Sequence, residues 1–509
     1  MVQESGFSDE PWLAGLNDAQ REAALARDPV LAVMAGPGTG KTRTLAARVA
    51  ALLSGNRARP GEILAVTFTR SAAREMRERL GSRAAAARVE TLHAFCLWLL
   101  KREAYPFGGA PRVAGEEDKA RFLEGLVSPG KRASFLEDIG RAKRRGTALA
   151  PLQARYQGRL EARGFLDFDD VLGQACRLLR ERPETAARLR REIRFVMVDE
   201  FQDTSPVQYD FLGLLGAENA FVIGDPDQAI YDFSNGSFDP FARFVEDRPS
   251  CRVLRLSENY RSQGVILKAA AQVISRNGSG SAPAARIADG LPIEISRHIS
   301  AREEAHGIAR KIEGLLGGAS HLSIDTLWAG KDRESYSYGL SEIAVLYRFH
   351  VQGRLIAQAL DRAGLPYRRF GGETAEEDYE SMLADEESAP GARRGEWISL
   401  MTFHRAKGLE FPVVFAAGLE EGILPRPAQG CGEGGLAAER RLFYVGLTRA
   451  GRRLFLSCAG KRFLFGELLK GGASRFLGEI EQALLMRREA EAGARRRRSG
   501  PDPQMMLDI

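Results

Sequence analysis

The sequence predicts an α/β fold in two tandem domains, the first of which carries a helical insertion. Strand-like apolar runs alternate with helical stretches from residue 16 to about 100, from 186 to 275, and again after a Gly/Ser-rich break at 278–283. This alternation is typical of parallel sheets joined by helical crossovers. A chain of 509 residues also exceeds what one hydrophobic core can organise, which agrees with more than one domain.

The individual strands are expected where short apolar runs precede polar or glycine-rich turns. In the first domain these runs are 30–34, 63–67, 195–198, 221–223 and 253–256, and in the second they are 343–346, 398–401, 413–415 and 454–457. Residues 97–185 contain no such series and are rich in Arg, Ala, Leu and Glu, so they are expected to form the helical insertion. Residues 319–339 are polar and predict a loop or hairpin insertion.

Composition excludes several classes of protein. With 44% hydrophobic and 28% charged residues the chain is an ordinary globular protein, and no apolar run approaches the roughly 18 residues of a membrane span. The acidic N-terminus does not resemble a signal peptide. The five cysteines are dispersed without a C-x-x-C pair, which argues against a disulfide framework or a zinc or iron–sulfur site and favours the reducing cytoplasm. The net charge of +6 is compatible with nucleic acid but is weak evidence alone.

A glycine-rich turn with a lysine and a threonine follows the first strand-like run. Backbone N–H groups in such a turn converge on phosphates, and the helix expected at 43–53 adds favourable partial charge from its N-terminus. Lys41 is expected to reach the β- and γ-phosphates of ATP, and the Thr42 hydroxyl to bind Mg²⁺. The predicted phosphate-binding loop comprises Ala35, Gly36, Pro37, Gly38, Thr39, Gly40, Lys41 and Thr42, with Ala35 where the pattern usually has glycine.

Polar residues end two later strands of the first domain. Asp199 is placed to hold the water shell of Mg²⁺, and Glu200 to orient or deprotonate an attacking water. Gln228 follows the strand at 221–223 and is placed to contact the γ-phosphate and report its loss. The two carboxylates and the loop together predict a nucleotide hydrolase.

A longer series of ordered motifs makes the sequence similar to one family. In order these are Leu16-Asn17-x-x-Gln20, the phosphate-binding loop, Thr67-Phe68-Thr69, Thr91-Leu92-His93-Ala94-Phe95, Phe168-Asp169-Asp170, Asp199-Glu200-Phe201-Gln202-Asp203, Gly224-Asp225-Pro226-Asp227-Gln228, Glu258-Asn259-Tyr260-Arg261-Ser262, the run from Thr402 to Phe411, and the run from Phe443 to Ala450. The chain resembles the UvrD/Rep/PcrA family of superfamily 1 DNA helicases from residue 12 to about residue 483.

The resemblance implies two tandem RecA-like P-loop domains. Domain 1A is expected at 1–96 and 186–277, helical subdomain 1B at 97–185, and domain 2A at 278–372 and 396–483. In the family a long helical accessory subdomain, 2B, precedes the motif that begins at Thr402; here only residues 373–395 stand in its place, too few to bury a core. Subdomain 2B is therefore expected to be vestigial or absent, and residues 484–509 to be a disordered basic tail.

The resemblance also implies roles for residues around the nucleotide. Gln20 would read the adenine edge, and Arg43 and Tyr260 would pack on the base. Arg261 and Arg449 resemble two arginine fingers from opposite sides of an interdomain cleft, where a permanently charged fork suits a phosphoryl transition state. Glu410 would contact the nucleotide from the second domain.

The implied function is an ATP- and Mg²⁺-dependent motor that moves 3′→5′ on single-stranded DNA, acts on tailed duplexes, and serves in repair or replication. Two alternatives are a single-stranded-DNA-dependent ATPase that does not unwind and a scaffold subunit of a repair or defence complex. A P-loop enzyme of another class, such as a small-molecule kinase, would leave the motifs after residue 402 unexplained.

Contacts with DNA are implied at positions that line the single-strand path in relatives. Aromatic rings there stack on any base. Three positions depart from the family pattern: Asp232, Phe233-Ser234 and Arg405. The residues concerned are Phe68, Thr69, His93, Tyr231, Phe233 and His404.

The last residues of the sequence offer one partner hypothesis. Gln504, Leu507 and Ile509 form a Q-x-x-L-x-hydrophobic pattern after an Arg- and Pro-rich stretch, which resembles peptides that bind sliding clamps. The alternative is an apolar chain end without a partner. The motor itself is expected to be a monomer.

Overall fold

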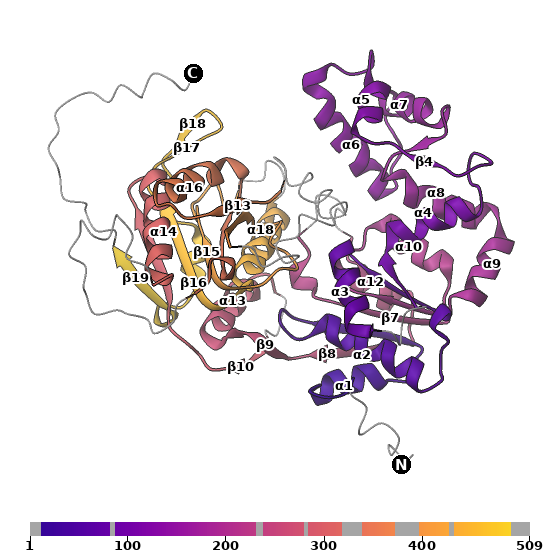
Figure 1. The fold of residues 1–509 in the computed structure, drawn as a ribbon, viewed down its shortest axis with the longest axis horizontal. Helices are drawn as coiled ribbons and strands as arrows, with labels where there is room; N and C mark the ends of the chain where they lie inside the picture. Colours follow the sequence, from indigo (N-terminus) through magenta and orange to yellow (C-terminus); the bar gives the residue numbers. More distant parts are fainter. Residues whose placement is uncertain are drawn as a thin grey trace.

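The computed structural model describes residues 12–81, 87–230, 238–278, 283–317, 338–371, 396–426 and 432–489. Two parallel sheets organise these residues, each flanked by helices, and they lie side by side with the chain crossing between them near β9 and β10 (Figure 1). Within these ranges no helix is long and apolar enough to cross a membrane.

The first sheet has six parallel strands in the order β3-β2-β6-β7-β1-β8. The five strands expected from sequence are confirmed, and β3 is an additional one. Their bounds are β1 (Val30–Ala35), β2 (Ile63–Thr67), β3 (Arg88–Thr91), β6 (Phe195–Val198), β7 (Asn219–Gly224) and β8 (Arg252–Leu256). The helices around this sheet are α1 (Asp18–Leu25), α2 (Lys41–Ser54), α3 (Arg70–Leu80), α4 (Leu92–Arg102), α8 (Asp170–Glu181), α9 (Pro183–Glu192), α10 (Pro206–Leu215) and α12 (Pro240–Glu246).

The helical insertion projects from one end of the first sheet (Figure 1). Its own small core, which includes Phe122, Ile139 and Tyr156, belongs to α5 (Glu116–Leu123), α6 (Arg132–Arg145) and α7 (Pro151–Glu161). A short parallel pair, β4 (Arg112–Val113) and β5 (Phe165–Leu166), closes its base. Helix α8 and the C-terminal half of α4, which fall in the expected range 97–185, bury their apolar faces in the core of the first sheet instead. The independently packed part of the insertion is thus narrower than that range.

The second sheet has seven parallel strands in the order β13-β14-β12-β15-β16-β11-β19. The four strands expected here are confirmed as β12 (Ile343–Tyr347), β14 (Ile398–Thr402), β15 (Phe411–Ala416) and β16 (Ala450–Ala459). The sequence did not indicate β11 (Ile293–His298), β13 (Tyr367–Arg369) or β19 (Leu485–Glu489). Other elements near this sheet include α14 (Ala301–Leu315), α16 (His350–Arg362), α18 (Gly432–Leu447), the parallel pair β9 (Glu258–Gln263) and β10 (Ala284–Ile287), and the hairpin β17 (Arg462–Leu464) with β18 (Glu467–Leu469).

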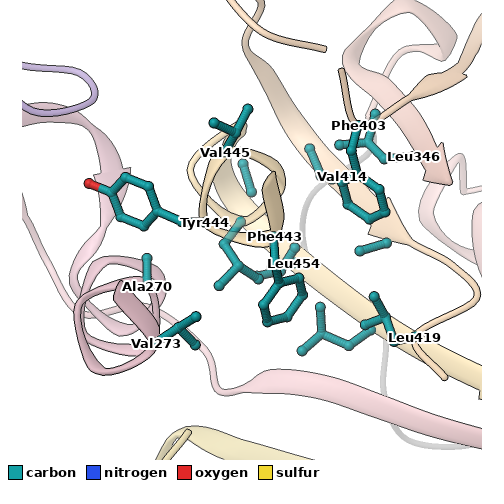
Figure 2. Close-up of a cluster of buried hydrophobic side chains, with 14 of the residues drawn as sticks. Ala270, Val273, Leu346, Phe403, Val414, Leu419, Phe443, Tyr444, Val445 and Leu454 are labelled. Carbon is teal, nitrogen blue, oxygen red and sulfur yellow. The ribbon is translucent and has the colours of Figure 1, made fainter. Parts of the chain in front are cut away.

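Helix α13 (Gly264–Ser275) corrects one expected domain boundary. Residues up to 277 are expected from the sequence to belong to the first domain, but α13 packs in the core of the second sheet. Figure 2 shows Ala270 and Val273 of α13 facing Phe443 of α18 and Leu454 of β16. The apolar face of α13 is buried in the core of the second sheet, and α13 follows β9 directly in the chain. The boundary between the two domains therefore falls at β9.

The expectation that residues 484–509 form a disordered tail is wrong for the first of these residues. Residues 485–489 form β19, an edge strand that pairs in parallel with β11, with Ile293 opposite Leu485. Backbone hydrogen bonds to β11 order this segment although its side chains Arg487 and Arg488 are polar. The rest of the expected tail, including Gln504–Ile509, lies outside the described residues.

Candidate active site

The phosphate-binding loop joins β1 to α2 and ends in a helix N-terminus with no side-chain cap. Gly38 and Gly40 take positive φ angles of 65° and 80°, which favour glycine. Gly40 is the N-cap of α2 and no side chain bonds to the first amides of that helix, so these amides are available to a phosphate. The Lys41 ammonium lies 3.5 Å from the Ala35 carbonyl oxygen and 3.9 Å from Glu200 Oε1. The expected strand, loop and helix are therefore in place.

The two carboxylates at the end of β6 face this loop. The Thr42 hydroxyl donates to Asp199 Oδ2 at 3.0 Å. Burial, together with the neighbouring charge of Glu200, raises the pKa of Asp199 above its usual range. Burial would also raise the pKa of Glu200, but the positive charges of Lys41 and Lys407 outweigh it and hold that pKa below its usual value. Glu200 is thus held as the carboxylate that a general base requires.

The pair Thr42 and Asp199 fits Mg²⁺. A hydroxyl and a carboxylate oxygen are hard ligands, and a cation beside Asp199 would relieve the cost of its buried charge. Over the described ranges, no group of three or more His, Cys, Asp or Glu side chains could hold a metal ion alone. This donor set suits Mg²⁺, which proteins often bind through one or two side chains together with substrate phosphates.

Gln228 and Arg449 meet across the two sheets. Gln228 ends the short 3-10 helix η5 (Pro226–Gln228) after β7, and its amide nitrogen donates to Asp225 Oδ2 at 2.7 Å. Arg449 Nη2 donates to Gln228 Oε1 at 2.9 Å, while its Nε and Nη1 donate to the carbonyls of Val445 and Leu409. Burial, with the like charge of Arg261, lowers the pKa of Arg449 to about 10, so the guanidinium remains charged at neutral pH.

The motif around Arg261 is fastened to the phosphate-binding loop. Asn259 Nδ2 donates to the Pro37 carbonyl at 2.5 Å, and the Tyr260 amide donates to the Gly38 carbonyl at 2.9 Å. Arg261 Nε lies 2.5 Å from Glu410 Oε2, so the expected first finger and the expected second-domain nucleotide contact form an ion pair in this structure. Arg261 therefore contacts the second domain through Glu410, as Arg449 contacts the first through Gln228.

The three residues expected around adenine lie together at the other end of the loop. Gln20 is buried in α1 and donates to the Thr39 carbonyl at 2.8 Å. Arg43 Nη2 donates to the Ala14 carbonyl at 2.7 Å. Tyr260 is 46% exposed, and its hydroxyl accepts from Asn17 Nδ2 at 2.9 Å. An exposed aromatic ring on the segment that is bonded to the phosphate-binding loop is a suitable surface for a base.

Lys407 and Asp203 are site residues that sequence reasoning did not single out. Lys407 Nζ lies 2.7 Å from Asp203 Oδ1 and donates also to the Gln228 carbonyl, so it joins the second domain to the first. Both side chains are almost fully buried. The sequence signal for them is their position in two motifs, the run from Asp199 to Asp203 and the run from Thr402 to Phe411.

The residues expected to contact DNA are less exposed than that role suggests. Phe68 and Thr69 are half-buried after β2, and Phe68 packs against the core of the second sheet. His93 is buried and stacks on Phe168 with ring centroids 4.1 Å apart, and His404 is also buried. Tyr231 and Phe233 lie outside the described residues. One small cavity is lined by Phe68, His93, Asp199 and Glu200 among others, so some of the expected DNA-contact and hydrolytic residues border a common space.

The fold and the site define a P-loop ATPase whose active site is shared by two domains. The sequence profile of the UvrD/REP helicase N-terminal domain matches residues 16–139 and 124–249, and that of the UvrD-like helicase C-terminal domain matches residues 254–374 and 379–461. The chain belongs to the UvrD/REP helicase family.

Curated relatives with similar sequences are named as DNA helicases. The ATP-dependent DNA helicase PcrA of Bacillus subtilis is 28% identical over 657 aligned positions, which cover 93% of this chain and 86% of the relative. DNA helicase II of Escherichia coli is 27% identical over 653 positions, covering 92% and 88% of the two chains. The ATP-dependent DNA helicase UvrD1 of Mycobacterium tuberculosis is 26% identical, covering 93% and 86%. Because this chain has 509 residues, each alignment is longer than the chain, and the relatives carry segments that it lacks.

Proposed function

We propose that the protein is an ATP-dependent DNA helicase or translocase that moves 3′→5′ on single-stranded DNA in repair or replication. The contact between Arg449 of the second domain and Gln228 of the first carries this proposal. A site that needs both domains couples ATP binding to closure of the cleft and hydrolysis to its opening. Family membership supports DNA as the track.

In this proposal Lys41 and the α2 N-terminus bind the phosphates, and Thr42 and Asp199 hold Mg²⁺, which supplies charge neutralisation to the transferred phosphoryl group. Glu200 orients or deprotonates the attacking water. Arg261 and Arg449 stabilise transition-state charge, with Arg261 leaving Glu410 when ATP is bound. Gln20, Arg43 and Tyr260 bind the base.

ATP hydrolysis with and without single-stranded DNA tests the proposal. Strong stimulation by DNA, abolished in Lys41→Ala, is expected. An assay that detects the arrival of the motor at a fluorescent label, placed at the 5′ end of the single strand or at its 3′ end, determines the direction of movement. Absence of stimulation, together with no effect of Lys41→Ala, would instead favour a scaffold role.

We also propose that subdomain 2B is absent from the motor or vestigial in it. The segment between Gly371 and Glu396 joins β13 to its parallel neighbour β14, and the alignments with relatives are longer than this chain. A motor without this subdomain is expected to unwind weakly, which favours a DNA-stimulated ATPase with limited strand separation as the second candidate. Robust unwinding of a 3′-tailed duplex by the purified monomer would contradict weak unwinding.

The remaining partner and state assignments are proposals as well. We propose a cytoplasmic monomer, a location supported by the free cysteines Cys96, Cys176, Cys251 and Cys458. Gln504–Ile509 is the proposed clamp-binding segment. Deleting residues 504–509 is expected to abolish pull-down by a sliding clamp and to leave ATP hydrolysis unchanged, whereas unchanged pull-down would contradict that assignment.

A further inference from the structure

Gln202 occupies the space between the proposed catalytic carboxylate and the turn that carries Gln228. It lies in the 3-10 helix η4 (Phe201–Asp203) directly after the two carboxylates, and it is 2% exposed. Its amide nitrogen donates to Glu200 Oε2 at 2.6 Å, and its amide oxygen accepts from the Asp225 backbone N–H at 2.9 Å. Both strong hydrogen-bonding groups of the side chain are therefore used.

These partners fix the orientation of the amide. The reversed orientation would place the amide oxygen against a carboxylate oxygen and the NH₂ group against a backbone N–H, and both contacts would be repulsive. A glutamine is the neutral side chain that supplies one donor and one acceptor at this length. A glutamate would present an oxygen where Glu200 requires a donor.

Gly224 provides the room for this arrangement. A Cβ atom at that position would lie 2.1 Å from Gln202 Oε1 and 2.9 Å from the Phe201 backbone nitrogen. The second distance involves backbone, which cannot move away without displacing η4. The close approach of η4 to the end of β7 therefore depends on glycine at position 224.

The contacts continue from Gln202 to the second domain. The Asp225 side chain accepts from Gln228, and Gln228 in turn accepts from Arg449. Through Gln202 the carboxylate of Glu200 is thus linked to the turn that meets the second domain. A displacement of this turn would move the group that holds Glu200.

We infer that Gln202 is a positioning residue that holds the Glu200 carboxylate in place for attack by water and ties its position to the turn that contacts Arg449. The inference rests on the proposed ATP hydrolysis. Gln202 touches neither substrate nor metal in this role; it acts through Glu200.

The test compares Gln202→Met, which keeps the length but removes both hydrogen bonds, with Gln202→Glu, which keeps the shape but replaces the donor by an acceptor. Both are expected to lower kcat for DNA-stimulated ATP hydrolysis about 10- to 100-fold, because small displacements of a catalytic group are costly, while KM for ATP changes less than about threefold. Gln352→Met, another buried glutamine, in α16 of the second domain, is the matched control and is expected to lower the melting temperature without this loss of kcat.

A double-mutant cycle separates positioning from a structural role. In the Glu200→Gln background, single-turnover hydrolysis is expected to fall less than about threefold further on adding Gln202→Met, because the group that Gln202 holds is no longer a carboxylate. An equal fold-loss in both backgrounds, or an unchanged kcat in the single variants, would overturn the inference. If Gln202→Met does not fold, the same cycle with Gln202→Glu decides. If the unmodified protein showed no DNA-stimulated ATP hydrolysis, that result would contradict the proposed function. Failure of the proposed function is therefore distinguishable from failure of the inference about Gln202.

Discussion

Arg449 Nη2, in the second domain, donates a hydrogen bond to Gln228 Oε1, in the first domain, at 2.9 Å. The same guanidinium is held from behind by the carbonyls of Val445 and Leu409 in its own domain. The second domain thus fixes the position of the guanidinium, and the first domain supplies the hydrogen bond between Arg449 and Gln228. Domain closure and the charge environment of the site are coupled through this one side chain.

Arg449→Ala is expected to lower kcat about 10³- to 10⁵-fold, the range for removal of an arginine finger. Arg449→Lys should recover little of the loss, because an ammonium cannot reproduce the directed contacts that the three nitrogens of the fork make. Nucleotide affinity, measured with a fluorescent non-hydrolysable ATP analogue, should change far less than kcat. The exposed neighbour Arg452→Ala serves as the control; an equal loss there would contradict a specific role for Arg449.

The buried ion pair between Lys407 and Asp203 predicts a strong dependence of stability on having both partners. Lys407→Met leaves the Asp203 carboxylate buried without its cation, which is expected to reduce the free energy of unfolding by about 3–5 kcal/mol. The double variant Asp203→Asn/Lys407→Met should recover much of that loss, because no buried charge then remains unpaired. Urea denaturation of the two single variants and the double variant measures the coupling. If the losses of the two single variants simply added in the double variant, the ion pair would contribute little to the free energy of unfolding.

Because His93 is buried in its neutral form, the free energy of unfolding is expected to fall as the pH is lowered. Burial, with the positive charge of Arg144, lowers the pKa of His93 to about 3 in the folded protein, against 6.5 ordinarily. The unfolded chain therefore takes up the proton first, so this contribution to stability is complete above pH 6.5 and is lost as the pH falls toward 3. From pH 7 to pH 5 the loss should be about 2 kcal/mol. In His93→Gln, urea denaturation at the two pH values should show a loss smaller by that amount, and equal losses would contradict a buried neutral imidazole.

The sequence was sufficient for the parts of the site that follow long apolar runs. β6 is buried throughout and β1 and β7 are buried over most of their length, so the polar residues that follow them within six positions, Lys41, Asp199 and Gln228 among them, could be assigned to one edge of a parallel sheet. Edge strands such as β13, with sequence YRR and two of three residues exposed, have no apolar pattern to detect. The placement of α13 on the second sheet was not predicted for a related reason. Its apolar residues predict a buried helix face, but they do not indicate which of the two cores buries it.

Contacts between the domains could not be derived from local pattern. Lys407 and Asp203 are 204 residues apart, and their pairing depends on how two separate sheets are packed. The same holds for the ion pair of Arg261 with Glu410. The resemblance placed Arg261 and Glu410 at the nucleotide but gave no reason to expect them to bind each other.

The fit of Asn259 and Arg261 against the phosphate-binding loop predicts that Gly38 tolerates no side chain. A Cβ there would lie 2.5 Å from Asn259 Nδ2 and 2.7 Å from Arg261 Cβ, and the φ angle of 65° is itself unfavourable for alanine. Gly38→Ala is expected to cost about 1–3 kcal/mol of stability from backbone strain alone. It should also weaken ATP binding at least about tenfold, because the loop and the arginine motif must separate to admit the methyl group. Gly61→Ala is the matched control, since a Cβ at Gly61 meets nothing within 4 Å. Isothermal titration with a non-hydrolysable ATP analogue measures both variants, and equal affinities would mean that the close contact at Gly38 is not needed for nucleotide binding.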